Sequence, residues 1–268
     1  MKFNLDTYRK MLDIAMEHWP FVSYREIETK ERFIVWRHDC DMSLNRALSI
    51  AEIDKTAGAK STFFIYPRSE YYNVLESSQT KLLLEIANLG HEIGVHVDLS
   101  CHGEVETDAE LISSIENDAR IVEDILQNEI KVFSFHNPNT MTSQFRRPTY
   151  GRFINCYSQW IFDNIEYCSD SNGYWRHRPI PELLENRELQ RIQVLTHPEW
   201  WIEQDVPPRD RVLRAVYGRA VRLMNQYDAQ MSVQSNRENV GSSSRQLDEE
   251  VAIAQQLIFG ETVPDEIR

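Results

Sequence analysis

The stretch RFIVWRHDCDMSLNRALSIAEIDKTAGAKSTFFIY, residues 32–66, has the pattern of a strand, a helix and a second strand. Residues 32–37 form a short apolar run that is typical of a buried strand. Residues 43–57 have helical spacing, with Ser43 in the N-cap position and Gly58 directly after the end. Residues 59–66 are again strand-like. Because strand, helix and strand in succession form a parallel βαβ unit, this stretch predicts an α/β fold.

The same alternation continues along the chain. A helix over residues 80–89, closed by Gly90, precedes a strand over 91–98, and a capping box of Thr107 and Glu110 begins a helix that extends to about residue 128. Further expected elements are an N-terminal helix over 6–18, strands over 131–137, 165–169 and 191–196, and a helix from about Pro208 towards Met231. We therefore predict a parallel sheet in a distorted or incomplete (β/α) barrel.

We expect a single domain over residues 1–268, with its core at about 32–234. The polar stretch SNRENVGSSSRQ, residues 235–246, has the composition of a linker, and residues 247–259 form an amphipathic segment after it. We expect that last segment to pack on the body or on a second subunit. The oligomeric state does not follow from the sequence.

Composition excludes several classes of protein. The 268 residues are 41% hydrophobic, which is enough for a buried core. The four cysteines form no CxxC pair, so neither a zinc ribbon nor a redox dithiol is indicated. A formal net charge of −13 without a basic run argues against nucleic acid and leaves polar small molecules or sugars as partners.

The first 19 residues lack the basic start, continuous apolar stretch and small-residue cleavage site of a secretory signal. No later segment reaches the eighteen or so apolar residues of a membrane span. We therefore expect a cytoplasmic protein without a membrane span.

Polar side chains follow four of the predicted strands. Asp39 and Asp41 end the first of these strands, His96 and Asp98 the next, His136 and Asn137 the third, and His197 the last. The carboxyl ends of parallel strands meet at one edge of a sheet, where α/β proteins place their active sites. We expect these side chains to gather there.

Asp39 and Asp41 alternate with Cys40, so both carboxylates point to one side of the strand and the thiol to the other. One carboxylate can then bind a divalent metal such as zinc, with histidines as the other ligands, while the second acts as a base. The alternative is that Asp41, two residues before Ser43, merely favours the dipole of the following helix.

The other histidines and the aromatic cluster have simpler interpretations. We expect structural roles for His38, which alternates with Asp39, and for His91, at the start of a strand, and a solvated position for His102 in a polar loop. The aromatic residues near the last strands either pack in the core or stack on sugar faces. They are Tyr174, Trp175, Trp200 and Trp201.

Five motifs occur in a characteristic order over about residues 32–201. They are WRHDCD (36–41), GAKSTFFI (58–65), LGHEIGVHVD (89–98), FSFHNP (133–138) and LTHPEWW (195–201). In order and spacing they resemble those of the polysaccharide deacetylase superfamily, the NodB-homology or carbohydrate esterase family four fold. The resemblance is strongest to a branch with HDxD and SFHxP motifs, which is found among proteins of surface-polysaccharide and O-antigen (lipopolysaccharide) biosynthesis.

The resemblance implies a distorted (β/α) barrel and a divalent metal held by an aspartate and two histidines. It also implies an aspartate base and a histidine acid, which together remove an N- or O-acetyl group from a sugar. Matched by position, Asp41 and His96 correspond to metal ligands and His197 to the late catalytic histidine, the acid.

Two positions depart from the family's motifs. Cys40 stands directly before Asp41, where the family has a second aspartate, so Asp39 serves as base only if the end of the strand is rearranged. Ser100 stands four residues after His96, in place of the second histidine of His-x-x-x-His. We therefore assign the third metal ligand to His136 in preference to His102.

The expected function is that of a zinc-dependent hydrolase that deacetylates an N-acetylated sugar, in nucleotide-linked or lipid-linked form. Sugar contacts are expected from four residues: Asn137, Tyr174, Trp175 and Trp200. Two alternatives are a non-catalytic carbohydrate-binding relative of the fold and a metal hydrolase that acts on another acyl amide.

Overall fold

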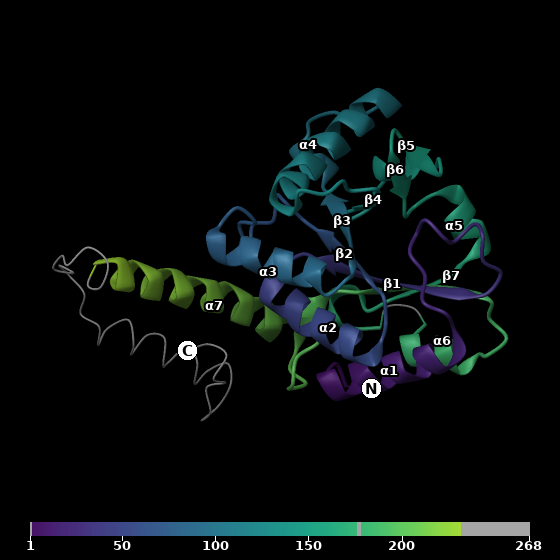
Figure 1. Ribbon diagram of the computed structural model, residues 1–268, viewed down its shortest axis with the longest axis horizontal. Coiled ribbons are helices and arrows are strands. Elements are labelled where there is room, and N and C mark those ends of the chain that lie inside the picture. The colour runs from purple at the N-terminus through teal and green to yellow at the C-terminus, as the bar shows by residue number, and fades with distance from the viewer. Residues whose placement is uncertain (1, 176–177, 232–268) are drawn as a thin grey trace. The chain divides into compact units, whose positions relative to one another are not determined.

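An eight-stranded sheet organises the first part of the computed structural model, which describes residues 2–175 and 178–231 (Figure 1). The chain divides into two compact units, residues 1–208 and residues 209–268. The sheet belongs to the first unit.

The strand order is β5-β6-β4-β3-β2-β1-β8-β7, and neighbouring strands are parallel except for the pair β5 and β6. Among the described residues β5 and β7 remain the two edges, so the sheet does not close. The predicted α/β fold with an incomplete barrel is therefore confirmed. The strands are β1 (Phe33–Cys40), β2 (Thr62–Ile65), β3 (Glu92–Val97), β4 (Val132–Phe135), β5 (Thr149–Tyr150), β6 (Phe153–Asn155), β7 (Glu166–Ser169) and β8 (Arg191–Thr196).

One helix precedes the first strand and others connect the parallel strands, as the alternating pattern predicted. In the first unit they are α1 (Leu5–His18), α2 (Leu44–Ala57), α3 (Ser77–Asn88), α4 (Asp108–Leu126), α5 (Gln159–Asn164) and α6 (Ile180–Glu185). Short 3₁₀ turns follow several strands, among them η1 (Leu99–Cys101) after β3 and η4 (Pro198–Trp200) after β8. The helix α7 (Pro208–Ala229) begins at the last residue of the first unit, and the rest of it belongs to the second. None of the described helices is both long and apolar enough to cross a membrane.

The predicted helix caps are present and fix where the helices begin. The Ser43 hydroxyl accepts a hydrogen bond from the backbone N–H of Arg46 at 3.3 Å, and Gly58 ends α2 with a φ of 82°. Thr107 and Glu110 form the complete capping box of α4. α2 starts shortly after β1, whereas a longer loop that contains η1 separates β3 from α4, and both connections leave the carboxyl edge of the sheet.

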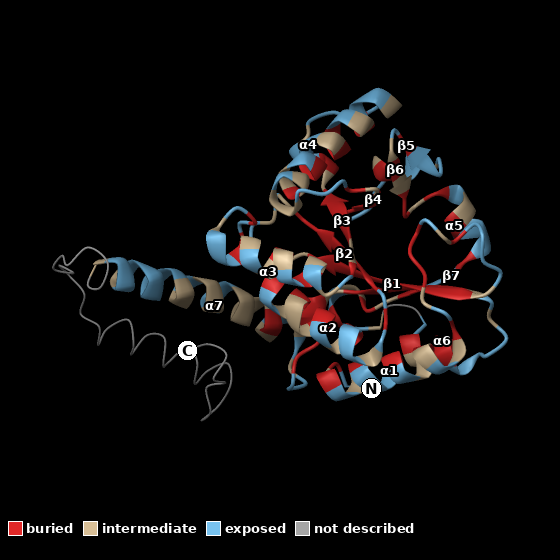
Figure 2. Cartoon of the chain, in the orientation of Figure 1, coloured by how far each residue is buried: buried red, intermediate tan, exposed pale blue. Residues whose placement is uncertain are grey.

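All eight residues of β1 are buried, and the strand lies inside the sheet, between β2 and β8 (Figure 2). On one face, His38 contacts Asp54 of α2, with 2.9 Å between Nε2 and the carboxylate, and Thr196 of β8 at 2.7 Å. On the other face, Arg37 and Asp39 point into the barrel. The interior below them is filled by apolar side chains, which include Val22, Tyr24, Ile27, Phe33, Val35, Phe64 and Val132.

Two histidines have the structural roles that the sequence predicted. His38 is completely buried between Asp54 and Thr196. The Nε2 atom of His91 lies 2.9 Å from the carbonyl oxygen of Ala51. Both side chains tie strands to α2 on the outer side of the sheet, away from the barrel mouth.

Several short elements were not predicted: β5, β6, α5 and α6, which have two to six residues each. The helix expected from Pro208 towards Met231 corresponds to α7, which ends at Ala229. The predicted linker, 235–246, and the amphipathic segment, 247–259, lie outside the described residues.

Candidate metal centre

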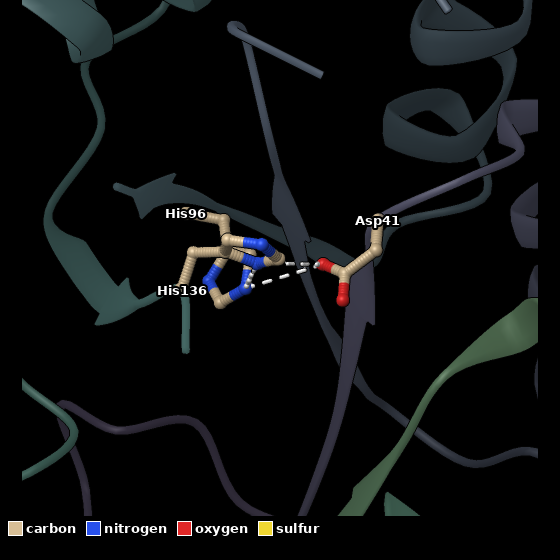
Figure 3. A group of neighbouring side chains, drawn as sticks. All are labelled: Asp41, His96 and His136. Carbon is tan, nitrogen blue, oxygen red and sulfur yellow. Dashed lines mark hydrogen bonds and ion pairs between the residues drawn. The ribbon is translucent and has the colours of Figure 1, made fainter. Parts of the chain in front are cut away.

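Three side chains from three strand ends converge at the mouth of the barrel (Figure 3). They are Asp41 after β1, His96 in β3 and His136 after β4, and one ligand atom of each lies within 4.8 Å of the other two. The Asp41 Oδ1 atom lies 3.2 Å from His96 Nε2 and 3.4 Å from His136 Nδ1. The two ring nitrogens are themselves 3.2 Å apart. The structure thus brings together the three residues that we expected to bind metal.

The parallel register explains why these residues meet. His96 pairs with Ser134 between β3 and β4, and the backbone N–H of His136 donates to the carbonyl oxygen of Val97 at 2.8 Å. His136 is therefore held at the same level of the sheet as His96. Asp41 leaves β1 one residue after Cys40 and turns towards them.

The donor set fits a divalent metal ion. Ser134 Oγ lies 2.7 Å from His96 Nδ1, so Nε2 is the nitrogen that faces the centre. Asn137 Nδ2 lies 2.9 Å from His136 Nε2, which leaves Nδ1 facing it. Asp41 Oδ1 is buried, and no described residue gives it a hydrogen bond of good geometry. One carboxylate oxygen and two imidazole nitrogens, each with an outer partner, are ligands that suit zinc.

The charge of Asp41 also suits such a site. Burial raises the pKa of Asp41, but contacts with His136 and His96 outweigh this and hold the pKa well below its usual range. Asp41 is therefore a carboxylate near neutral pH, as a metal ligand must be.

Asp39 lies beside the three ligands. Its Oδ2 atom is 3.7 Å from His96 Nε2, and the carboxylate is only 2% exposed. Arg37 donates to the same oxygen at 2.8 Å, and Ser134 Oγ lies 3.4 Å from it. The end of the strand is regular: β1 continues to Cys40, and alternation places Asp39 and Asp41 on one side.

Arg37 is a residue that sequence reasoning missed. It is completely buried, and its guanidinium contacts both Asp39 and the hydroxyl of Tyr157, at 2.8 and 3.0 Å. The missed indication was its position two residues before Asp39, on the same face of the strand. A buried cation there compensates the charge of Asp39 and fixes its direction.

His197 lies on the other side of the centre, with Nε2 3.9 Å from Asp41 Oδ2. Its Nδ1 atom is 2.6 Å from Asp170 Oδ1, and its backbone N–H donates to Asp170 Oδ2 at 2.9 Å. Burial lowers the pKa of His197, but the charge and hydrogen bond of Asp170 outweigh it and raise the pKa to about 10. His197 is therefore an imidazolium at neutral pH.

Asp170 was also missed from the sequence, although it directly follows a predicted strand and thus lies at the same edge. It is completely buried and accepts a further hydrogen bond from Trp201 Nε1 at 2.8 Å. Because both its oxygens are bound, it holds the ring of His197 in one orientation.

We expect Asp170→Asn to lower the pKa of His197 from about 10 towards the ordinary histidine value of about 6.5. The imidazolium exists below the pKa, so the variant should lose this charge as the pH rises through neutrality, where the wild type keeps it. An NMR titration of the His197 ring in EDTA-treated protein measures this. Asp163→Asn, at an exposed position of α5, is the control, and an unchanged pKa in Asp170→Asn contradicts the assignment.

The residues expected to contact sugar lie in different environments. Asn137 is exposed, with a φ of 45°, and Tyr174 is 50% exposed, so both can meet a ligand. Trp175 packs on Phe3, with ring centroids 4.7 Å apart. Trp200 is only 4% exposed and offers no free ring face. For the two tryptophans the structure thus favours the packing interpretation, and sugar contact stays a prediction for Asn137 and Tyr174.

His102 has a partner that we did not expect. Its Nε2 atom lies 3.0 Å from Asp118 of α4, and Asp118 also accepts a hydrogen bond from Arg68 at 2.7 Å. The prediction of a solvated loop histidine was therefore wrong, because the loop folds back on α4. His136, and not His102, joins Asp41 and His96.

We compared the chain with known proteins. No family model matches the sequence, and no curated protein matches it. Solved carbohydrate deacetylases resemble the fold. The catalytic domain of a peptidoglycan N-acetylglucosamine deacetylase from Eubacterium rectale is 14% identical, with a TM-score of 0.42 over 68% of this chain and 81% of that one. For the chitin deacetylase of Colletotrichum lindemuthianum the identity is 12%, the TM-score 0.38 and the shares 68% and 80%.

A carbohydrate esterase family four (CE4) pseudoenzyme of Bacillus anthracis is also similar. It is 16% identical, with a TM-score of 0.42 over 74% of this chain. The present chain covers 62% of the length of that protein, less than two thirds.

Proposed function

We propose that this chain is a metal-dependent deacetylase that removes the acetyl group from an N-acetylated sugar. The observation that carries the proposal is the arrangement around one point of Asp41, His96 and His136, with a buried carboxylate on one side and a protonated histidine on the other. These are a metal-ligand set, a base and an acid within reach of each other.

The three ligands would hold a divalent ion, for which zinc is our first choice. Such an ion supplies Lewis acidity towards a carbonyl oxygen and lowers the pKa of water. Ser134 keeps His96 in the tautomer that offers Nε2, and the low pKa of Asp41 keeps its carboxylate ionised. These contacts thus set the tautomer and the charge of the ligands in the absence of an ion.

Asp39 acts as the base in this proposal. Arg37 and Ser134 contact its Oδ2 atom from the barrel interior, and the same oxygen lies 3.7 Å from His96 Nε2 at the centre. There it takes a proton from the water molecule that attacks the acetyl carbonyl carbon. The attack forms the new carbon–oxygen bond, and the proton stays on Asp39 until the product leaves.

His197 acts as the acid. The carbon–nitrogen bond breaks only if the amine leaves with a proton, because an unprotonated amide nitrogen is a poor leaving group. His197 holds that proton at neutral pH, and Asp170 directs Nε2 towards the centre. Acetate and the free amino sugar are then the products.

The substrate is an acetylated carbohydrate in nucleotide-linked or lipid-linked form, used in surface-polysaccharide (O-antigen or lipopolysaccharide) biosynthesis in the cytoplasm. The surface-polysaccharide role rests on the resemblance of the HDCD and SFHNP motifs. Exposed Asn137, next to His136, and exposed Tyr174, four residues after Asp170, offer a polar and an aromatic contact that suit a sugar ring.

The test is acetate release from a panel of nucleotide-linked and lipid-linked sugars, with protein that was stripped with EDTA and then reloaded with zinc. We expect equal amounts of acetate and free amine from an N-acetylated member, and neither without the ion. Saturable sugar binding without release favours a non-catalytic relative of the fold. Release from an N-formyl sugar in preference to the N-acetyl sugar favours a hydrolase of other acyl amides.

A further inference from the structure

Tyr66 lies against both histidines of the candidate metal centre. It follows β2, and its ring is stacked on that of His136, with centroids 4.5 Å apart and an interplanar angle of 27°. The same ring meets His96 edge-on, at 5.9 Å and 85°. Tyr66 is only 7% exposed, and its ring lines the site.

The position of this ring is fixed at both ends. The Tyr66 hydroxyl donates to Asp98 Oδ2 at 2.8 Å, and its backbone N–H donates to the hydroxyl of Tyr72 at 3.1 Å. Asp98 in turn accepts hydrogen bonds from the backbone N–H and the hydroxyl of Ser100, at 2.9 and 2.7 Å. Burial and the bond to Asp98 raise the pKa of Tyr66, so its hydroxyl keeps the proton that it donates.

The two histidines differ in the contacts that they make with residues other than Tyr66. His96 is 2% exposed within β3, and its Nδ1 atom is bound by buried Ser134. His136 follows the end of β4, and the partner of its Nε2 atom is Asn137, an exposed residue with a φ of 45°. The ring of His136 is therefore the less constrained of the two, and the Tyr66 ring covers one of its faces.

We propose that Tyr66 is a positioning residue of the metal centre: it holds the ring plane of His136 so that Nδ1 faces Asp41 and His96, and it thereby increases the affinity for a divalent ion. This inference rests on the metal site of the proposed function. A ligand ring that is already oriented loses less conformational freedom when it binds the ion, and outer partners of this kind typically change metal affinity about 10- to 100-fold.

The experiment measures zinc affinity in competition with a chromophoric chelator, without any substrate. We expect Tyr66→Leu to bind zinc about 10- to 100-fold more weakly than the wild type, because the stacked ring is lost. Tyr66→Phe keeps the ring but loses the hydrogen bond to Asp98. We expect its zinc affinity to lie between those of the wild type and Tyr66→Leu. Tyr150→Leu is the matched control, since Tyr150 is also buried but packs on Phe133 and Phe145.

The outcomes separate this inference from the proposed function. Wild-type affinity in Tyr66→Leu, or an equal loss in Tyr150→Leu, overturns the role of Tyr66 and leaves the metal site intact. If Tyr66→Leu does not fold, Tyr66→Phe decides: weaker binding than in the wild type supports the proposal, and equal binding overturns it. Zinc binding without deacetylation by the wild type contradicts the proposed function alone, and no zinc binding by the wild type overturns the metal site itself.

Discussion

Asp41→Ala protein is expected to fold and to lose its affinity for zinc. The substitution removes the only carboxylate of the ligand group and leaves two imidazole nitrogens 3.2 Å apart. Loss of an outer partner costs about 10- to 100-fold in metal affinity, and we expect loss of a direct ligand to exceed that range. Titration calorimetry on EDTA-stripped protein and metal analysis of protein as purified both measure this.

Two comparisons make the result specific. Asp6→Ala removes a carboxylate that is largely exposed in α1, so it should leave zinc binding unchanged. His136→Ala should behave like Asp41→Ala, whereas His102→Ala should not, because His102 is bound to Asp118. Zinc bound by Asp41→Ala with wild-type affinity contradicts the ligand assignment, and loss of zinc in His102→Ala with retention in His136→Ala reverses the choice of third ligand.

The sequence predicted the candidate site largely because parallel sheets bring strand ends together. Asp41, His96 and His136 each follow or end an apolar run, and a shared edge was enough to group them. His136 could be chosen over His102 as the third ligand without any interatomic distance, because His136 directly follows a strand. His102 lies several residues beyond a strand, in a loop that can fold back on a helix.

The partners of these residues were harder to predict. Arg37 and Asp170 lie in buried surroundings that form only when the sheet curves and β8 pairs with both β1 and β7. Arg37 occurs in an apolar run, where a buried cation is not expected unless its partner is known. Tyr66 was one of several aromatic residues at strand ends, and no pattern in the chain indicates which ring will face a histidine.

Burial of the aromatic cluster was also difficult to predict. Trp200 follows a strand end and has the composition of a sugar platform, yet it is buried. The 3₁₀ turn η4 directs its side chain inwards, and a turn of three residues leaves no periodicity in the sequence. The same limit explains why β5, β6, α5 and α6 were not predicted.

His197→Ala is expected to reduce deacetylation by about two to four orders of magnitude, the range typical of lost acid–base catalysis. The ring of His197 supplies the proton of the leaving amine and is not among the three ligands, so zinc affinity should change little. Initial rates of acetate release at saturating zinc, with the calorimetric affinity measured in parallel, separate the two effects. His18→Ala, in the last turn of α1, is the control for loss of a histidine elsewhere.

The size of the loss depends on which step limits the rate, and this makes the comparison with Asp39→Asn informative. Asp39 acts when water attacks and His197 when the amine leaves, so each variant should be slow for a different reason. A substrate with a better leaving group, such as an O-acetyl ester, needs no strong acid. It should restore much of the rate of His197→Ala and little of the rate of Asp39→Asn. Equal restoration in both variants contradicts the separate roles, and wild-type turnover in His197→Ala shows that the proton of the leaving amine comes from another group.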